Sequence, residues 1–224
     1  MMRTLNKQSK SEFELNKYVV VRNVLGRQSQ LFFFEYIKMR AELYNTIRTK
    51  LPHLYEEAHW GHSALNETAC ISGSYSRFGD PTIETLLMML QENVELETGL
   101  ELIPTYSFFR LYRTGDELLV HKDRPSCEIS VSLCAGCVGD ELWPIFIEGT
   151  PIYLEPGDMV IYRGCDVTHW RDPLEGEMQA QMFFHYNDTN GPYGKDNLYD
   201  GRLSIGLPYR ESSWYENSRT QSEG

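Results

Sequence analysis

The sequence has no long apolar run and no segment rich in positive charge. Its longest apolar stretch, residues 31–37, is interrupted by Glu35, so no segment approaches the roughly 20 residues that span a bilayer. Acidic residues outnumber basic ones by 32 to 21, which gives a formal net charge of -11 at pH 7. Because such a surface is repelled by a phosphate backbone and by an anionic bilayer, we expect neither nucleic acid nor a membrane as a partner.

Cysteine is scarce, and its number is odd. No charged segment followed by an apolar one, as in a secretory signal, precedes the five cysteines, which are Cys70, Cys127, Cys134, Cys137 and Cys165. We therefore expect reduced thiols in a cytoplasmic protein. Cys134 and Cys137 have the spacing of half a zinc knuckle or of a redox motif. No second pair exists, however, and Gly136 between them is more typical of a plain turn after a strand.

The N-terminal half has the pattern of helices with one strand. A chain of 224 residues suits one domain, with or without a helical extension. Residues 1–17 are polar and expected to be mobile at their start, and the β-branched residues that follow predict a strand over 18–25. Apolar residues at helical spacing predict a helix over 30–50.

A second helix is marked at both of its ends. Asp80 is a good N-cap, and Pro81 occupies a first-turn position where no amide partner is needed. Gly99 suits the left-handed conformation that commonly follows a helix. The sequence therefore predicts a helix between these residues.

Beyond Leu100 the sequence consists of short aromatic and β-branched runs. Eight of them follow within about eighty residues, at 106–113, 118–123, 128–134, 142–148, 150–156, 158–164, 167–170 and 178–186. Turn residues separate them without a helix-length gap, which predicts an all-β roll, and a jelly roll has this number of strands. We expect a mainly β chain with flanking helices (α+β), in which a helical support region (1–103) precedes the jelly-roll core (104–187) and a C-terminal extension (188–224). The end of that extension is expected to be disordered.

A metal site is the chemistry that this pattern favours. His121 and Asp123 are two apart at the end of an apolar run, so on a strand both side chains leave the same face. This pair alone is weak evidence, and His169 is the candidate third ligand. Two imidazoles and one carboxylate form a facial triad, the geometry of non-haem Fe(II) oxygenases. A cupin-type site would need more histidines, and we expect His59 and His62 to be a loop pair without a ligand role.

Three segments carry a resemblance to a known family. They are FRLYRTGDELLVHKD (109–123), LEPGDMVIYRGCDVTHW (154–170) and GEMQAQMFFHY (176–186). Together they resemble the double-stranded β-helix core of the 2-oxoglutarate- and Fe(II)-dependent dioxygenases, closest to the prolyl 4-hydroxylase-like branch. The resemblance implies His121, Asp123 and His169 as iron ligands. It also implies Tyr112 in the 2-oxoglutarate pocket, although a plain core tyrosine fits that position equally well.

The sequence departs from this family on its last strand. Such enzymes carry an Arg or Lys nine to ten residues after the distal histidine, where this chain has Met178 and Gln179. A buried carboxylate without a cation is costly, so another base must reach the cosubstrate or the cosubstrate assignment fails. We expect Arg110, on the same face as Tyr112, to supply the cation and Gln179 an amide. The alternatives are Gln181 for the amide, and Arg163 and Arg124 for the cation.

The resemblance also implies an activity. Fe(II) would be the cofactor, with 2-oxoglutarate and O₂ as cosubstrates, and an unactivated C–H bond would be hydroxylated with release of succinate and CO₂. Related halogenases replace the carboxylate ligand by a small residue, so the retained Asp123 favours hydroxylation. Arg124, Arg163 and Arg171 near the ligands predict a carboxylate-bearing or otherwise anionic substrate, such as an amino acid or a peptide segment. The alternative is a cupin-like protein that binds a metal or small ligand without oxidative turnover.

Overall fold

The computed structural model describes residues 7–51, 70–71, 74–139, 141–194 and 196–207. Its α-helices are α1 (Lys7–Asn16), α2 (Arg27–Lys50) and α4 (Pro81–Thr98), and its short 3-10 helices are η1 (Pro125–Cys127) and η2 (Leu198–Gly201). Its strands are β1 (Tyr18–Val21), β2 (Cys70–Ile71), β3 (Tyr75–Phe78), β4 (Leu102–Arg113), β5 (Glu117–His121), β6 (Ile129–Val138), β7 (Ile145–Ile147), β8 (Thr150–Ile152), β9 (Met159–Arg163), β10 (His169–Arg171) and β11 (Met178–Asp188).

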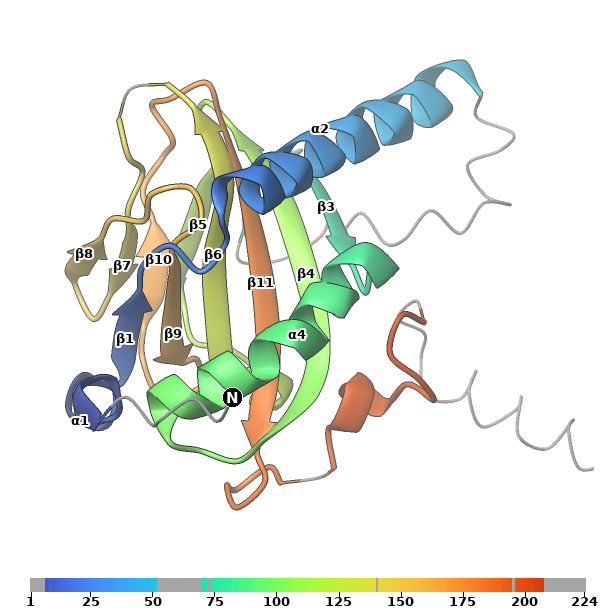
Figure 1. Ribbon diagram of the computed structural model, residues 1–224. Coiled ribbons are helices and arrows are strands. Elements are labelled where there is room, and N and C mark those ends of the chain that lie inside the picture. The colour runs from blue at the N-terminus through green and yellow to red at the C-terminus, as the bar shows by residue number, and fades with distance from the viewer. Residues whose placement is uncertain (1–6, 52–69, 72–73, 140, 195, 208–224) are drawn as a thin grey trace, which may run out of the picture.

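The strands form two antiparallel sheets (Figure 1). The larger sheet has the order β1-β9-β6-β11-β4-β3, and the smaller has the order β2-β5-β10-β7-β8. From β4 to β11 the chain crosses from one sheet to the other at each step except that from β7 to β8, which pair within the smaller sheet, and this is the connectivity of a jelly roll. Each of these eight strands overlaps one of the eight predicted runs, so the mainly β fold with flanking helices is confirmed.

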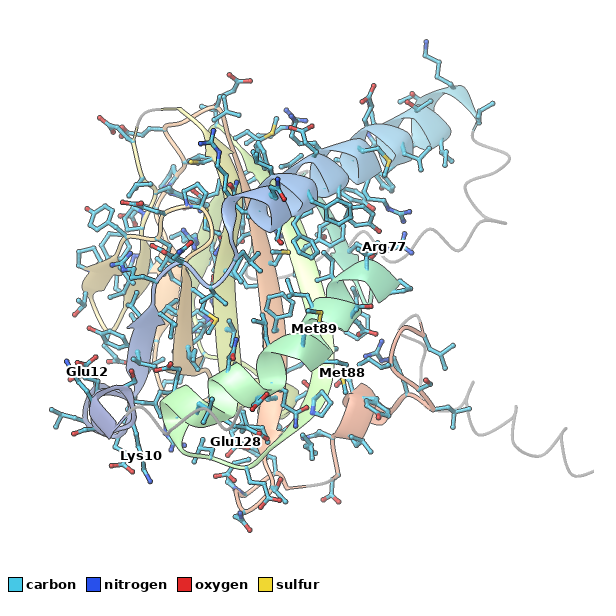
Figure 2. All side chains as sticks on the ribbon, viewed as in Figure 1. Lys10, Glu12, Arg77, Met88, Met89 and Glu128 are labelled. Carbon is cyan, nitrogen blue, oxygen red and sulfur yellow. The ribbon has the colours of Figure 1, made fainter. Side chains whose placement is uncertain are left out.

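Helices α2 and α4 cover the outer face of the larger sheet (Figure 1). As predicted, Asp80 caps α4 by accepting a hydrogen bond from the amide of Thr82, and Gly99 ends the helix with φ 72°. The buried side of α4 packs on the sheet, whereas Met88 and Met89 project from its outer side and are 43% and 70% exposed (Figure 2). Within the described residues no helix is long and apolar enough to cross a bilayer.

Three expectations about the N-terminal half need correction or extension. Residues 7–16, expected only as a polar segment, form α1, because the completely buried Phe13 anchors it to the core. Strands β1, β2 and β3 add to the two sheets of the roll by pairing with β9, β5 and β4. The expected boundary between residues 103 and 104 therefore falls inside β4.

Gly136 lies inside β6, where the sequence suggested a turn. A Cβ at this position would come within 2.6 Å of the Phe34 ring of α2, so the glycine lets the helix approach the sheet. Cys134 and Cys137 belong to the same strand, and they, Cys127 and Cys165 are all free thiols, as expected. Cys134 is buried, and burial raises its pKa to about 12.

The C-terminal extension returns to the body of the protein. Arg202 forms an ion pair of 2.7 Å with Glu84 of α4, and both side chains are 1% exposed. The Arg202 guanidinium also donates to the carbonyl oxygen of Thr105 on β4. Residues 208–224, which include the segment predicted to be disordered, lie outside the described part of the chain, as do His59 and His62.

Candidate metal centre and cavity

The three predicted metal ligands come together at the paired ends of two strands. His121 ends β5, His169 begins β10, and the two residues face each other in the antiparallel pair. Asp123 follows β5, and its Oδ1 lies 3.6 Å from Nε2 of His121 and 3.4 Å from Nε2 of His169. One ligand atom from each residue lies within 4.8 Å of the others. Two nitrogens and one oxygen are therefore grouped closely enough to be candidate ligands of a single ion.

Backbone carbonyls fix the orientation of both imidazoles. Nδ1 of His121 lies 2.7 Å from the carbonyl oxygen of Leu119, and Nδ1 of His169 lies 3.3 Å from that of Val167. A carbonyl oxygen can only accept, so each Nδ1 carries the hydrogen and each Nε2 presents its lone pair to the cluster. This is the tautomer that a metal ion requires.

The carboxylate of Asp123 is held from its other side. Its Oδ2 accepts a hydrogen bond of 2.6 Å from Ser130 Oγ, and its backbone amide donates to the carbonyl oxygen of Gly164. Burial alone would raise the pKa of Asp123, but the proximity of the His121 and His169 imidazoles outweighs it and holds the pKa well below its usual range. A Cβ on Gly164 would lie only 2.2 Å from Oδ2, so glycine is required beside the carboxylate.

A second polar residue, His185 of β11, continues this network. Its Nδ1 lies 3.0 Å from Ser130 Oγ, and its ring packs on Tyr106 with 4.5 Å between centroids. Ser130 has a single hydroxyl proton, and its shortest contact is to Asp123, so Nδ1 of His185 donates to Ser130. Burial lowers the pKa of His185 to about 4, which leaves the ring neutral near pH 7.

Sequence reasoning did not find Ser130 and His185. They face each other across the β6–β11 pair, a contact between residues 55 positions apart. The only local signal was the alternation of side chains along a strand, which places His185 on the same face of the last predicted strand as Gln179.

The triad opens into a cavity of about 440 Å³ between the two sheets. Aromatic side chains make up much of its wall, and Arg110, Tyr112 and Arg124, which were predicted near the site, contribute to it. The lining residues are Tyr106, Phe108, Arg110, Tyr112, Leu118, His121, Asp123, Arg124, Cys127, Tyr162, His169, Phe183 and His185. The cavity therefore borders all three candidate metal ligands.

The arginines predicted near the site differ in their surroundings. Arg124 donates to both carboxylate oxygens of Asp200, at 2.8 and 2.7 Å, so its charge is compensated. Arg163 lies on the outer face of β9, with its guanidinium 5.1 Å from the centre of the Phe13 ring. The structure therefore places Arg163 outside the cavity, because the side chains of β9 that face inward are those of its even-numbered residues.

Two further arginines are buried inside the roll. Arg110 on β4 is 2% exposed and donates to Ser74 Oγ, and Arg171 on β10 is 1% exposed and donates to the carbonyl oxygen of Trp143. Gln179 is buried on the inner face of β11, where its amide donates to Gln181. The interior thus holds cationic and amide donors close to the triad.

Solved structures share this architecture, although no protein-family model and no curated protein matches the chain. A prolyl-4-hydroxylase from Pseudomonas putida is 15% identical with a TM-score of 0.56, and the match covers 80% of this chain and 96% of that one. The non-haem, α-ketoglutarate-dependent carbocyclase SnoK of nogalamycin biosynthesis is 14% identical with a TM-score of 0.58, and the match covers 92% of this chain and 94% of that one. EctD from S. alaskensis, solved with 2-oxoglutarate and 5-hydroxyectoine, is 13% identical with a TM-score of 0.57, and the match covers 92% of this chain and 87% of that one.

These likenesses show the fold. It is the double-stranded β-helix of the 2-oxoglutarate/Fe(II) oxygenases, prolyl 4-hydroxylases included, as the sequence resemblance predicts. In this chain the roll also carries a His-Asp-His cluster whose ligand atoms converge.

Proposed function

We propose that the protein is an Fe(II)- and 2-oxoglutarate-dependent dioxygenase that hydroxylates an unactivated C–H bond of an amino acid, a peptide or another small substrate. The observation that carries the proposal is the convergence of His121, Asp123 and His169 within 4.8 Å beside a cavity. Two neutral nitrogens and one hard oxygen suit Fe(II), and a facial triad leaves positions open for a chelating cosubstrate and O₂.

The protein's own groups would hold the metal and shape its surroundings. Nε2 of His121, Nε2 of His169 and Oδ1 of Asp123 would bind the ion, while Ser130 keeps Oδ2 of Asp123 engaged elsewhere. Iron and 2-oxoglutarate, when bound, would supply the oxidising chemistry together with O₂: 2-oxoglutarate would be converted to succinate and CO₂, and the second oxygen atom of O₂ would enter the substrate C–H bond. The aromatic wall, including Phe108 and Phe183, would exclude water from the reacting C–H bond.

Donors inside the roll suit a dicarboxylate cosubstrate. We propose that Tyr112 lines the 2-oxoglutarate pocket, together with Gln179 opposite it on β11 and a buried arginine, Arg110 or Arg171. Guanidinium groups match a carboxylate with two parallel hydrogen bonds, so either can replace the basic residue that the last strand lacks.

The proposal is tested by anaerobic titration. Protein loaded with Fe(II) should develop a visible metal-to-ligand absorption band when 2-oxoglutarate is added, and admission of O₂ should then release succinate. Absence of both signals would contradict the proposed function. Screening succinate release over amino acids and peptides would identify the substrate.

A cupin-like protein that holds a metal without oxidative turnover is the second candidate. The observation in its favour is the last strand, which presents Gln179 and Gln181 inward where a basic residue would serve 2-oxoglutarate. Replacing Asp123 by Ala separates the two. A catalytic iron site would lose turnover with little change in the melting temperature of the apo protein, whereas a structural site would lose the stabilisation that the metal provides.

A further inference from the structure

Arg171 is buried inside the roll, and no carboxylate from the described part of the chain pairs with it. It lies on the inner face of β10, two residues after His169, and it is 1% exposed. Its Nη1 donates to the carbonyl oxygen of Trp143 at 2.8 Å. Its Nε and Nη2 are also buried, and neither has a hydrogen-bond partner among the described residues. The titratable groups that act on it are Tyr112, Cys134 and Tyr162, none of them a carboxylate.

An arrangement of this kind is costly unless an anion completes it. Buried polar groups in proteins are nearly always hydrogen-bonded, and buried charges are nearly always paired. Nε and Nη2 lie on the same edge of a guanidinium, so the two free N–H groups of Arg171 form a fork. Such a fork matches the two oxygens of a carboxylate. The described residues supply no carboxylate here.

We propose that this fork binds the distal carboxylate of 2-oxoglutarate and so replaces the basic residue that the last strand lacks. The proposal rests on the function proposed above and assigns one residue within it. Two residues of a strand span about 6.6 Å, a step that suits a five-carbon diacid held at its other end by the metal beside His169.

The surroundings of Arg171 connect it with the cavity. Its guanidinium lies 4.7 Å from the centre of the Trp143 ring, and Tyr112, which lines the cavity, packs edge-on against the same ring at 4.9 Å. Tyr162, which also lines the cavity, packs against His169 at 4.8 Å. Arg110, the other candidate, approaches from β4 near the edge of the larger sheet, and its Nη1 donates to Ser74. We therefore assign Arg171 to the cosubstrate and leave Arg110 on the substrate side of the cavity.

The experiment compares two 2-oxo acids. Pyruvate keeps the metal-chelating end of 2-oxoglutarate but has no distal carboxylate. The dissociation constant of each is measured anaerobically from the absorption band of the Fe(II) protein, a readout that needs no turnover. Arg171→Met should weaken 2-oxoglutarate roughly 100-fold and change pyruvate less than about twofold, as expected for loss of a charged, two-point contact.

Three further variants make the result specific. Arg163→Met is the matched control, because Arg163 is a strand arginine outside the cavity, and it should leave both affinities unchanged. Arg171→Lys keeps the charge but loses the fork, so an intermediate loss is expected, and this variant decides if Arg171→Met does not fold. Wild-type affinity for 2-oxoglutarate in both Arg171 variants, or a selective loss in Arg110→Met alone, would overturn the assignment. A wild-type protein that binds pyruvate and 2-oxoglutarate equally would also overturn it, whereas one that binds neither would contradict the proposed function itself.

Discussion

Ser130 donates a hydrogen bond of 2.6 Å to Oδ2 of Asp123, while Oδ1 of the same carboxylate faces both histidines. The two oxygens of Asp123 therefore have separate tasks. One is free to bind a metal, and the other ties the side chain to β6. A hydrogen bond from His185 to Ser130 extends this support to β11.

Replacing Ser130 by Ala should weaken metal binding. Outer hydrogen-bond partners of metal ligands typically contribute 10- to 100-fold in affinity, so we expect a loss of about that size. Competition with a chromophoric chelator for Co(II) measures it. Ser132→Ala is the control, because Ser132 also faces inward on β6 but contacts Gln181. An unchanged affinity in Ser130→Ala would show that Asp123 needs no such support.

Replacing Gly164 by Ala should disrupt the metal site more severely. The added Cβ would lie 2.2 Å from Oδ2 of Asp123 and 2.4 Å from the carbonyl oxygen of Cys127, so the carboxylate must move. We expect a stability loss of about 2 kcal/mol from overpacking, and metal affinity below that of Ser130→Ala. Urea unfolding and the same chelator competition measure both effects. Gly26→Ala, with open space around the added Cβ, should change neither.

The pH dependence of stability should report on His185. Its pKa falls from 6.5 to about 4 on burial, so between these values the unfolded chain binds a proton that the folded one excludes. The contribution of His185 to the free energy of unfolding is therefore fully present above pH 6.5 and is lost as the pH falls toward 4, by roughly 3 kcal/mol in all. Thermal melting of the metal-free protein across this range measures the slope. His185→Phe should flatten it, and an equal slope in that variant would assign the effect to another group.

Nitrogen NMR of the same histidine tests its tautomer. We expect the hydrogen on Nδ1, since the Ser130 hydroxyl donates its own hydrogen bond to Asp123 and can only accept one from His185. Long-range proton–nitrogen correlation spectra of histidine-labelled protein distinguish the two forms. In Ser130→Ala we expect the preference for the Nδ1–H tautomer to be lost. An Nε2–H tautomer in the wild type would contradict the prediction, because Ser130 would then donate to His185.

The buried pair between Arg202 and Glu84 should be important for stability. Removing one partner of such a pair leaves an uncompensated charge, so Arg202→Met should cost about 3–5 kcal/mol in urea unfolding. The exposed pair between Lys10 and Glu14 provides the contrast, because Lys10→Met should cost less than about 1 kcal/mol. Equal losses in the two variants would contradict the burial argument.

Local signals predicted the parts of this fold that depend on neighbours in sequence. Asp80, Pro81 and Gly99 mark the ends of α4 because capping involves only adjacent backbone groups. His121 and Asp123 were found from spacing, since alternation along a strand is local. Helix α1 was missed because Phe13 is its one buried hydrophobic side chain, which leaves no helical period to detect.

The rest of the site depends on contacts between distant strands. Ser130 and His185 come into contact only when β6 and β11 pair, and no local sequence pattern predicts that contact. Arg163 looked close to the site because Gly164 adjoins it, but alternation along β9 turns its side chain outward. The same alternation from His169 turns Arg171 inward, so strand parity carried more information about the arginines than nearness in sequence.

The returning C-terminal segment couples two layers of the molecule. Arg202 forms an ion pair with Glu84 on the outer helix, while Asp200, two positions earlier, forms an ion pair with Arg124 beside the candidate metal ligand Asp123. Tyr199 and Asp200 both hold left-handed backbone angles, with φ of 53° and 56°. The cavity wall at Arg124 is consequently connected, through the segment from Asp200 to Arg202, to helix α4 on the far side of the sheet.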